Sequence, residues 1–276
     1  MLTREETWEK LLGNNVIQGV MPSGSWNLSG TNLSGLDISG ANLNEADIRW
    51  AKLDKANLMN AGLVGAYLNQ SDLSGINLKG ANMVGAVFVA ASLTGADLSN
   101  ANISNGELGR ANLSRANLDQ ANLSGAYLIE TDCSNASLQR AILYRAVLGG
   151  ANLSGANCSE SDLSETDFNV ANLSKANLTK ANLFRADLNA VSLKGADLSE
   201  ANLSEANLRD TDLGGVRLKG ANLQGANLNG AKKLTVAQLS EVKTLFAAQL
   251  SPRLMKQIEK EYPNLLTLPT ADCSNF

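Results

Sequence analysis

The 276-residue chain is rich in Ala, Asn, Leu, Ser and Gly, contains no histidine, and has only 4% aromatic residues. Its formal net charge of −4 leaves no basic excess with which to bind nucleic acid or an anionic membrane directly. Such a biased composition is typical of disorder or of a repeat architecture. The regular placement of Leu favours a repeat, because buried apolar surface offsets the entropy of the chain.

Residues 1–20 are predicted to form a helical cap on the N-terminal end of the repeats. Residues 3–6 have the form of a capping box, and an apolar helical stripe follows. The residue at position 26 is too large for an interior corner and is expected to plug the first coil. The apolar residues assigned to this cap are Trp8, Leu11, Leu12 and Trp26.

The start of the sequence lacks the basic and apolar regions of a signal peptide. No stretch approaches the roughly 18 apolar residues that are needed to span a bilayer. We therefore expect a cytoplasmic protein that does not insert into membranes.

A five-residue repeat dominates residues 21–231. Placing a unit centre, i, at every fifth residue from Leu28 to Leu228 gives 41 consecutive centres without an insertion or deletion. Every centre is apolar and 33 are Leu, while position i−2 is Ala in 29 units and position i−1 is Asn or Asp in 29. Ser is commonest at i+1, and Gly occupies i+2 in 16 units.

A period of five fits neither the helical 3.6 nor the strand 2.0, but it fits a short extended segment followed by a sharp corner. Positions i−2 and i then point to the same side, so that Leu fills the axis and Ala lets the corner fold tightly. Positions i−1 and i+1 are expected to face water, and Gly or Asn near the corner tolerates the turn. Stacked coils must pair their backbone groups about 4.8 Å apart, which predicts an all-β solenoid.

The units at residues 151–155 (ANLSG) and 171–175 (ANLSK) match the pattern A-[D/N]-L-x-x. In these units the chain resembles the pentapeptide-repeat family, in particular cyanobacterial members with helical N- and C-terminal caps. The resemblance covers about 205 of the 276 residues. It implies a right-handed quadrilateral β-helix of twenty residues per coil, with about ten coils and a length of about 50 Å.

Two sequence signals bear on the number of sides. Opposite charges recur at the i+2 corner with a spacing of twenty, but also with a spacing of fifteen, so charge alone does not separate four sides from three. The large apolar residues at outward positions are more informative. With four faces, numbered in chain order from the unit centred on Leu28 (face 1), thirteen of these fourteen residues fall on faces 1 and 4, and only Met59 does not. A three-sided coil would scatter them.

This segregation predicts an interaction surface, because contiguous exposed apolar area marks partner sites and Tyr and Trp are common anchors. The alternative, that β-branched and aromatic residues merely suit strands, does not explain their gathering on two adjacent faces. The candidate surface consists of Trp50, Val64, Tyr67, Val84, Val87, Val89, Tyr127, Ile129, Ile142, Tyr144, Val147 and Phe184. Val170 also lies on these two faces but is not part of the candidate surface.

Residues 232–276 are predicted to form a two-helix C-terminal cap. Thr235 and Gln238 form a capping box that opens the first helix, and Ser251-Pro252 opens a second helix that runs to about Glu261. The tail also resembles the ending of many cyanobacterial family members, some of which dimerise through this end. The residues assigned to the cap are Leu239, Val242, Leu245, Phe246, Leu254, Met255 and Ile258.

The sequence offers no chemistry for an enzyme, a cofactor or a metal. It lacks His, a phosphate-binding loop and a nucleophile elbow, and Cys133, Cys158 and Cys273 have neither metal nor disulfide spacing. We expect a non-catalytic scaffold, monomeric or dimeric, that presents its surface to an unidentified protein or to itself.

The family resemblance implies an alternative, since some members mimic DNA and bind DNA gyrase, protecting it from quinolones. Such mimicry needs a long surface of one sign. The repeats here carry 20 acidic and 15 basic residues, and their corner columns alternate in sign.

Overall fold

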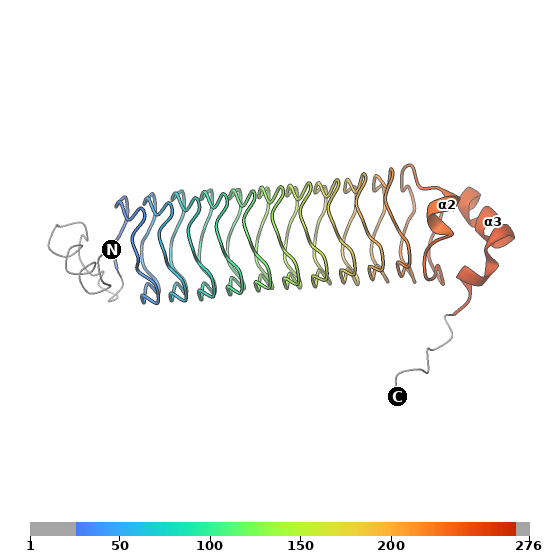
Figure 1. The fold of residues 1–276 in the computed structure, drawn as a ribbon. Coiled ribbons are helices and arrows are strands. Elements are labelled where there is room, and N and C mark those ends of the chain that lie inside the picture. The colour runs from blue at the N-terminus through green and yellow to red at the C-terminus, as the bar shows by residue number, and fades with distance from the viewer. Residues whose placement is uncertain (1–25, 269–276) are drawn as a thin grey trace, which may run out of the picture.

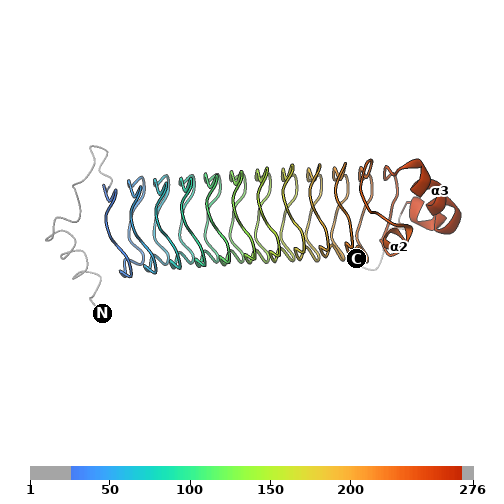
Figure 2. The same ribbon diagram turned by 90° about the horizontal axis from the view of Figure 1, so that it is seen from above.

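The computed structural model describes residues 26–268. The chain winds as a stack of similar coils along one straight axis (Figures 1 and 2). Helices α2 (Val236–Leu239) and α3 (Pro252–Glu261) lie at the C-terminal end of the stack, and the 3-10 helix η1 (Pro263–Leu266) follows them. The predicted N-terminal helix with Trp8, Leu11 and Leu12 lies outside the described residues.

The pairing register shows that each coil has four sides. Parallel β-bridges join position i−1 of each unit to the residue twenty positions later, from Asn27↔Asp47 to Asp212↔Lys232. A coil therefore contains four five-residue units, which confirms the four-sided prediction and excludes three sides. The pairing consists of isolated bridges because a corner interrupts the extended backbone in every unit.

The hydrogen bonds of one unit satisfy all five of its backbone N–H groups. Position i−2 donates across the corner to the preceding centre, position i−1 donates to the preceding coil, and positions i and i+2 donate to the following coil. The fifth N–H, at i+1, donates to the side-chain oxygen of the unit's own Asn or Asp, as Ser154 does to Asn152 at 3.2 Å. This Asx bond is present in 28 of the 29 units that carry Asn or Asp at i−1.

The expectation that the i−1 residues simply face water is therefore incomplete. Their oxygen closes the local turn, and their amide nitrogen reaches the coil below. Asn207 Nδ2 donates to Asp187 Oδ1 at 2.8 Å, and Asn172 Nδ2 donates to Asn152 Oδ1 at 3.3 Å. Asn is thus selected because it satisfies the backbone and links neighbouring coils at the same time.

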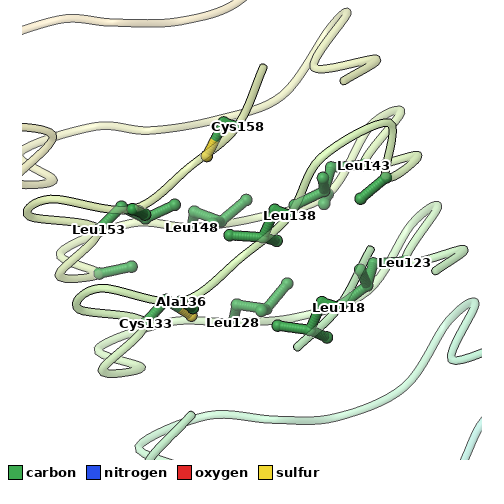
Figure 3. Close-up of a cluster of buried hydrophobic side chains, with 14 of the residues drawn as sticks. Leu118, Leu123, Leu128, Cys133, Ala136, Leu138, Leu143, Leu148, Leu153 and Cys158 are labelled. Carbon is green, nitrogen blue, oxygen red and sulfur yellow. The ribbon is translucent and has the colours of Figure 1, made fainter. Parts of the chain in front are cut away.

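The core is a continuous column of Leu and Ala. The centres and their i−2 neighbours are buried, and Figure 3 shows successive centres projecting into the axis. Position i+2 has a left-handed backbone in all 41 units, of which 16 carry Gly and 25 carry another residue. For a residue other than Gly this conformation costs about 1 kcal/mol or more, and the surrounding coil imposes it.

Two cysteines occupy centre positions in adjacent coils. Cys133 and Cys158 are free and buried (Figure 3). Burial raises the pKa of both thiols, that of Cys158 to about 12. The reactive thiolate is therefore scarce at neutral pH.

We expect both thiols of a Cys273→Ser variant to resist an aromatic disulfide reagent at about pH 8 in the native protein, and to react at once after denaturation. Absorbance at the reagent's thiol-specific wavelength follows the reaction. Rapid labelling of either cysteine under native conditions would show that these coils open locally, against the continuous core seen here.

The C-terminal segment differs from the prediction in one respect. The capping box of Thr235 and Gln238 is present, but α2 ends at Leu239, so the prediction that Val242 and Leu245 or Phe246 continue its stripe is wrong. Residues 243–251 instead resume the repeat.

The resumed repeat is recognisable in both pairing and backbone conformation. Thr244 bridges Asn222 and Gln249 bridges Asn227, a spacing of 22 in place of 20. Ala247 has the left-handed backbone of a corner, with φ of 57°. The single turn of α2 accommodates the two extra residues.

Gln238 completes the hydrogen bonding where α2 replaces a regular side. Its Nε2 donates to the carbonyl oxygens of Val216 (3.0 Å) and Leu213 (3.1 Å). In a regular coil the Val216 carbonyl would accept a backbone N–H from 21 residues later. Gln238 Oε1 accepts the backbone N–H of Thr235 at 2.9 Å. One side chain thus replaces a missing backbone donor and caps the helix.

The remaining cap residues lie against the end of the core. Helix α3 has the predicted bounds, although the Ser251 side chain makes no capping bond. The fully or nearly buried members are Leu239, Val242, Leu245 and Ile258, and the partly buried members are Phe246, Leu254 and Met255. At the other end, Trp26 packs partly buried against the first coil.

Candidate functional site

The predicted surface residues are unequally exposed. Exposed members are Trp50, Tyr67, Tyr127, Ile129 and Ile142. Half-buried members are Val64, Val84, Val87, Val89, Tyr144, Val147 and Phe184. On face 1, Trp50 and Tyr67 lie in adjacent coils, and Tyr127 and Ile129 flank one centre three coils further along the rod.

The aromatic rings of face 4 are covered by arginines. The Arg145 guanidinium lies 4.9 Å from the ring centre of Tyr144, and Arg185 lies 4.7 Å from that of Phe184. Each arginine is held in place by a glutamate of the next coil at 2.7 Å. These rings offer less apolar surface than the sequence suggests. On face 1 the ring of Trp50 is covered in the same way, by Arg49 at 5.2 Å, whereas no arginine covers Tyr67 or Tyr127 within residues 26–268.

Face 1 interrupts the Asx pattern over five consecutive coils. Position i−1 is Tyr67, Val87, Glu107, Tyr127 and Val147 in turn. The other seven units without Asn or Asp never follow one another in adjacent coils of a face. In these five units of the described chain, no hydrogen bond satisfies the N–H at i+1. Since each such bond contributes about 1 kcal/mol, this run of five units forgoes stabilisation that most other units of the rod have.

The same face carries strained and unsatisfied groups. Trp50 and Val170 occupy left-handed corners with φ of 57° and 55°, which is especially unfavourable for a β-branched residue. Val170 is nevertheless 63% exposed. Asn69 Oδ1 is the one buried side-chain oxygen or nitrogen without a hydrogen-bond partner among residues 26–268. Departures from local rules tend to gather at functional sites.

Two glycines shape the surface around Ile129. Gly109 and Gly149 occupy i+1 one coil before and one coil after it, and neither has a left-handed backbone. A Cβ at either position would meet only ordinary van der Waals contacts, 3.7 Å and 3.9 Å away. Neither backbone angle nor neighbour requires Gly, so its effect is to leave a notch on each side of Ile129. The first notch forms a hollow of about 250 Å³ lined by Val89, Gly109, Arg110, Ile129 and Glu130.

Sequence reasoning missed several residues of this surface, namely Glu107, Gly109, Arg110, Glu130, Gly149 and Val170. A signal for some of them is present in the sequence. It is the run of five units on one face without Asn or Asp, together with Gly at i+1, where Ser is the usual residue.

Residues 26–268 provide neither a metal site nor a membrane-spanning helix. No group of three or more Cys, Asp or Glu there could hold a metal ion. No helix in that range combines the length and hydropathy required to cross a bilayer.

Restoring the Asx pattern is expected to stabilise the protein. In a Tyr127→Asn/Val147→Asn variant, the new side chains would accept the N–H groups of Ile129 and Gly149 and link to each other. We expect the free energy of unfolding to rise by about 1–2 kcal/mol in urea titrations. The matched Tyr127→Gln/Val147→Gln variant is polar but too long to close the turn and should gain nothing. A loss of stability in the Asn variant would show that Tyr127 and Val147 are structural.

The comparison with protein families agrees with this architecture. The family model described as pentapeptide repeats matches in 8 copies that together span residues 27–232. HetL, a pentapeptide repeat protein involved in heterocyst differentiation regulation from the cyanobacterium Nostoc sp. strain PCC 7120, is 34% identical, over 84% of this chain and 94% of its own (TM-score 0.42). The pentapeptide repeat protein alr5209 from Nostoc PCC 7120 is 35% identical, over 40% of this chain and 84% of its own (TM-score 0.32).

QnrB1, a plasmid-mediated fluoroquinolone resistance protein, is 20% identical, over 81% of this chain and 96% of its own (TM-score 0.36). No curated protein sequence matches the chain.

Proposed function

Because the chain belongs to the pentapeptide repeat family, whose fold is a right-handed quadrilateral β-helix, we propose that it is a non-catalytic scaffold that presents face 1 to a protein partner. The observation that carries this proposal is the run of five units from Tyr67 to Val147, in which apolar or charged side chains replace the stabilising Asn or Asp. A rod of about ten coils holds these side chains in fixed register, and its C-terminal segment closes the core. A cytoplasmic location stays a prediction.

Mimicry of DNA toward DNA gyrase is the alternative function, and the charge pattern does not favour it. Glutamates at the corners pair with arginines of the adjacent coil, as in Arg110–Glu130 (2.7 Å) and Arg140–Glu160 (2.8 Å). The resulting columns alternate in sign, whereas duplex DNA presents continuous negative charge. Titratable inhibition of gyrase supercoiling by the purified protein would favour the alternative.

Site-specific photo-crosslinking tests the proposed function. A photoreactive phenylalanine analogue would replace Tyr127 on face 1, or Lys79, which is exposed on the opposite face 3. The proteins would be illuminated in extract from the natural host, and the adducts identified by mass spectrometry. We expect a discrete protein adduct at position 127 and none at position 79. Equal adducts at both positions, or none at 127, would contradict a binding role for face 1.

A further inference from the structure

We propose that the partner of face 1 is a second copy of this chain, bound antiparallel about a two-fold axis. This inference rests on the proposed function and names its partner. The two-fold axis lies in the plane of face 1, at right angles to the rod. It reverses the order of residues along the rod and keeps their position across the face. A column, meaning the residues at one position of successive face 1 units, then meets the same column of the second copy in reverse order. Position i+1 therefore meets i+1 of the second copy, and i+2 meets i+2. Such an isologous interface requires each column to complement its own reversal.

The i+1 column of face 1 meets this requirement in shape. Read along the rod, it runs Val89, Gly109, Ile129, Gly149. With the axis between the units centred on Leu108 and Leu128, Ile129 faces Gly109 of the second copy, and Val89 faces Gly149. Each protruding side chain thus enters a notch, including the hollow of about 250 Å³ between Val89 and Ile129.

Most charges of face 1 complement one another in the same register; Asp47, which lies opposite Asp187, is already paired with Arg49 at 2.7 Å. At one edge Arg110 faces Glu130 of the second copy, and Glu130 faces Arg110. At the other edge Glu45 faces Arg185. In the middle of the face, Glu107 lies opposite Tyr127, whose hydroxyl can donate to the carboxylate. Complementary charges at the rim fix register and orientation.

Neighbouring registers lose this complementarity. An axis through the unit centred on Leu128 would place Ile129 on Ile129 and Glu130 on Glu130. An axis through the unit centred on Leu108 would place Arg110 on Arg110 and leave Gly109 facing Gly109. An axis between the units centred on Leu128 and Leu148 would also seat Ile129 opposite a glycine, Gly149, but it would place Glu107 opposite Asp167. Of these registers, only the one between Leu108 and Leu128 matches both the shape and the central charges of face 1.

The size of the face predicts weak association. From Trp50 to Ala190, which face each other in this arrangement, the surface spans seven coil steps, or about 34 Å, and is about 10 Å wide. It would bury roughly 400 Å² per copy, less than a standard stable interface. We expect a dissociation constant of about 10–100 µM, so that the dimer forms at high local concentration.

Charge reversal with mixing gives a sharp test. Both Arg110 and Glu130 have well-exposed side chains, so their substitution should leave the fold intact, and thermal unfolding checks this. Either single variant, Arg110→Glu or Glu130→Arg, places like charges opposite each other at both symmetry-related contacts. Sedimentation velocity should therefore show monomers of each variant at about 300 µM. In an equimolar mixture of the two variants, both contacts become opposite pairs, and dimers should return. Arg140→Glu and Glu160→Arg, the same kind of pair on a corner of face 3, should each associate like the wild type.

The outcomes separate the two proposals. If the wild type dimerises but the mixture of variants does not, the dimer uses another interface and this inference is overturned. If the wild type stays monomeric at about 300 µM while position 127 crosslinks to a different protein, the inference fails and the proposed function stands. If neither association nor a crosslink is found, both fail.

Discussion

Leu143→Ala is expected to lower the free energy of unfolding by about 3–4 kcal/mol, whereas Ile142→Ala, one residue away, should lower it by less than about 1 kcal/mol. Leu143 is a fully buried centre, and truncation leaves a cavity between neighbouring coils. Ile142 is 43% exposed at an outward position. The two substitutions remove apolar groups of equal size from opposite sides of the same backbone segment.

Urea unfolding followed by circular dichroism measures both effects. Because each coil contacts only its neighbours, the Leu143→Ala transition is also expected to broaden or split as the array loses cooperativity. Equal effects of the two substitutions would contradict the assignment of inside and outside that underlies the whole rod.

Gln238→Ala is expected to destabilise the protein by about 2 kcal/mol. The substitution removes the Oε1 atom that accepts the backbone N–H of Thr235, and it removes the Nε2 donor to the Val216 carbonyl oxygen. Gln238→Glu keeps an acceptor for the cap but turns a carboxylate toward two carbonyl oxygens. It should therefore be destabilising by a similar amount, through the lost donor rather than the lost cap.

Gln224→Ala is the matched control for Gln238. The side chain of Gln224 makes no hydrogen bond with any described residue, so its removal should change stability by less than about 0.5 kcal/mol. Thermal unfolding of the four proteins decides the matter. A Gln238→Ala variant as stable as Gln224→Ala would show that the end of the rod does not depend on this side chain.

The five-residue period predicted the core, because burial follows from spacing alone. The four-sided coil was predicted from the family resemblance and from the gathering of large outward apolar residues on two adjacent faces. The role of Asn and Asp was harder to infer, since it requires following each backbone N–H to its acceptor. Asn152 looks like a solvent-facing residue in the sequence. In the structure its Oδ1 accepts the backbone N–H of Ser154 and also the side-chain amide of Asn172 in the next coil.

The C-terminal error has a specific cause. Leu239, Val242 and Leu245 fit helical spacing, but Leu245 also begins a five-residue step to Leu250, with Ala248 in the usual i−2 position. A two-residue insertion hides that continuation from a strict count. On face 4, the covering of Tyr144 by Arg145 depends on side-chain direction, which spacing does not specify.

Labelling of single introduced cysteines provides the most direct test of whether face 1 binds a partner. In a Cys273→Ser background the buried Cys133 and Cys158 should stay inert, so a single new cysteine reports its own surroundings. Glu107→Cys places the probe in the middle of face 1, and Lys79→Cys places it on face 3. Maleimide labelling rates would be compared between dilute purified protein and extract from the natural host.

The account predicts that labelling at position 107 slows by at least about threefold in the extract or, where the partner is a second copy, in the purified protein at about 500 µM, while labelling at position 79 does not change. Unchanged labelling at both positions under both conditions, or protection at 79 alone, would contradict the proposal that face 1 is the working surface of this rod.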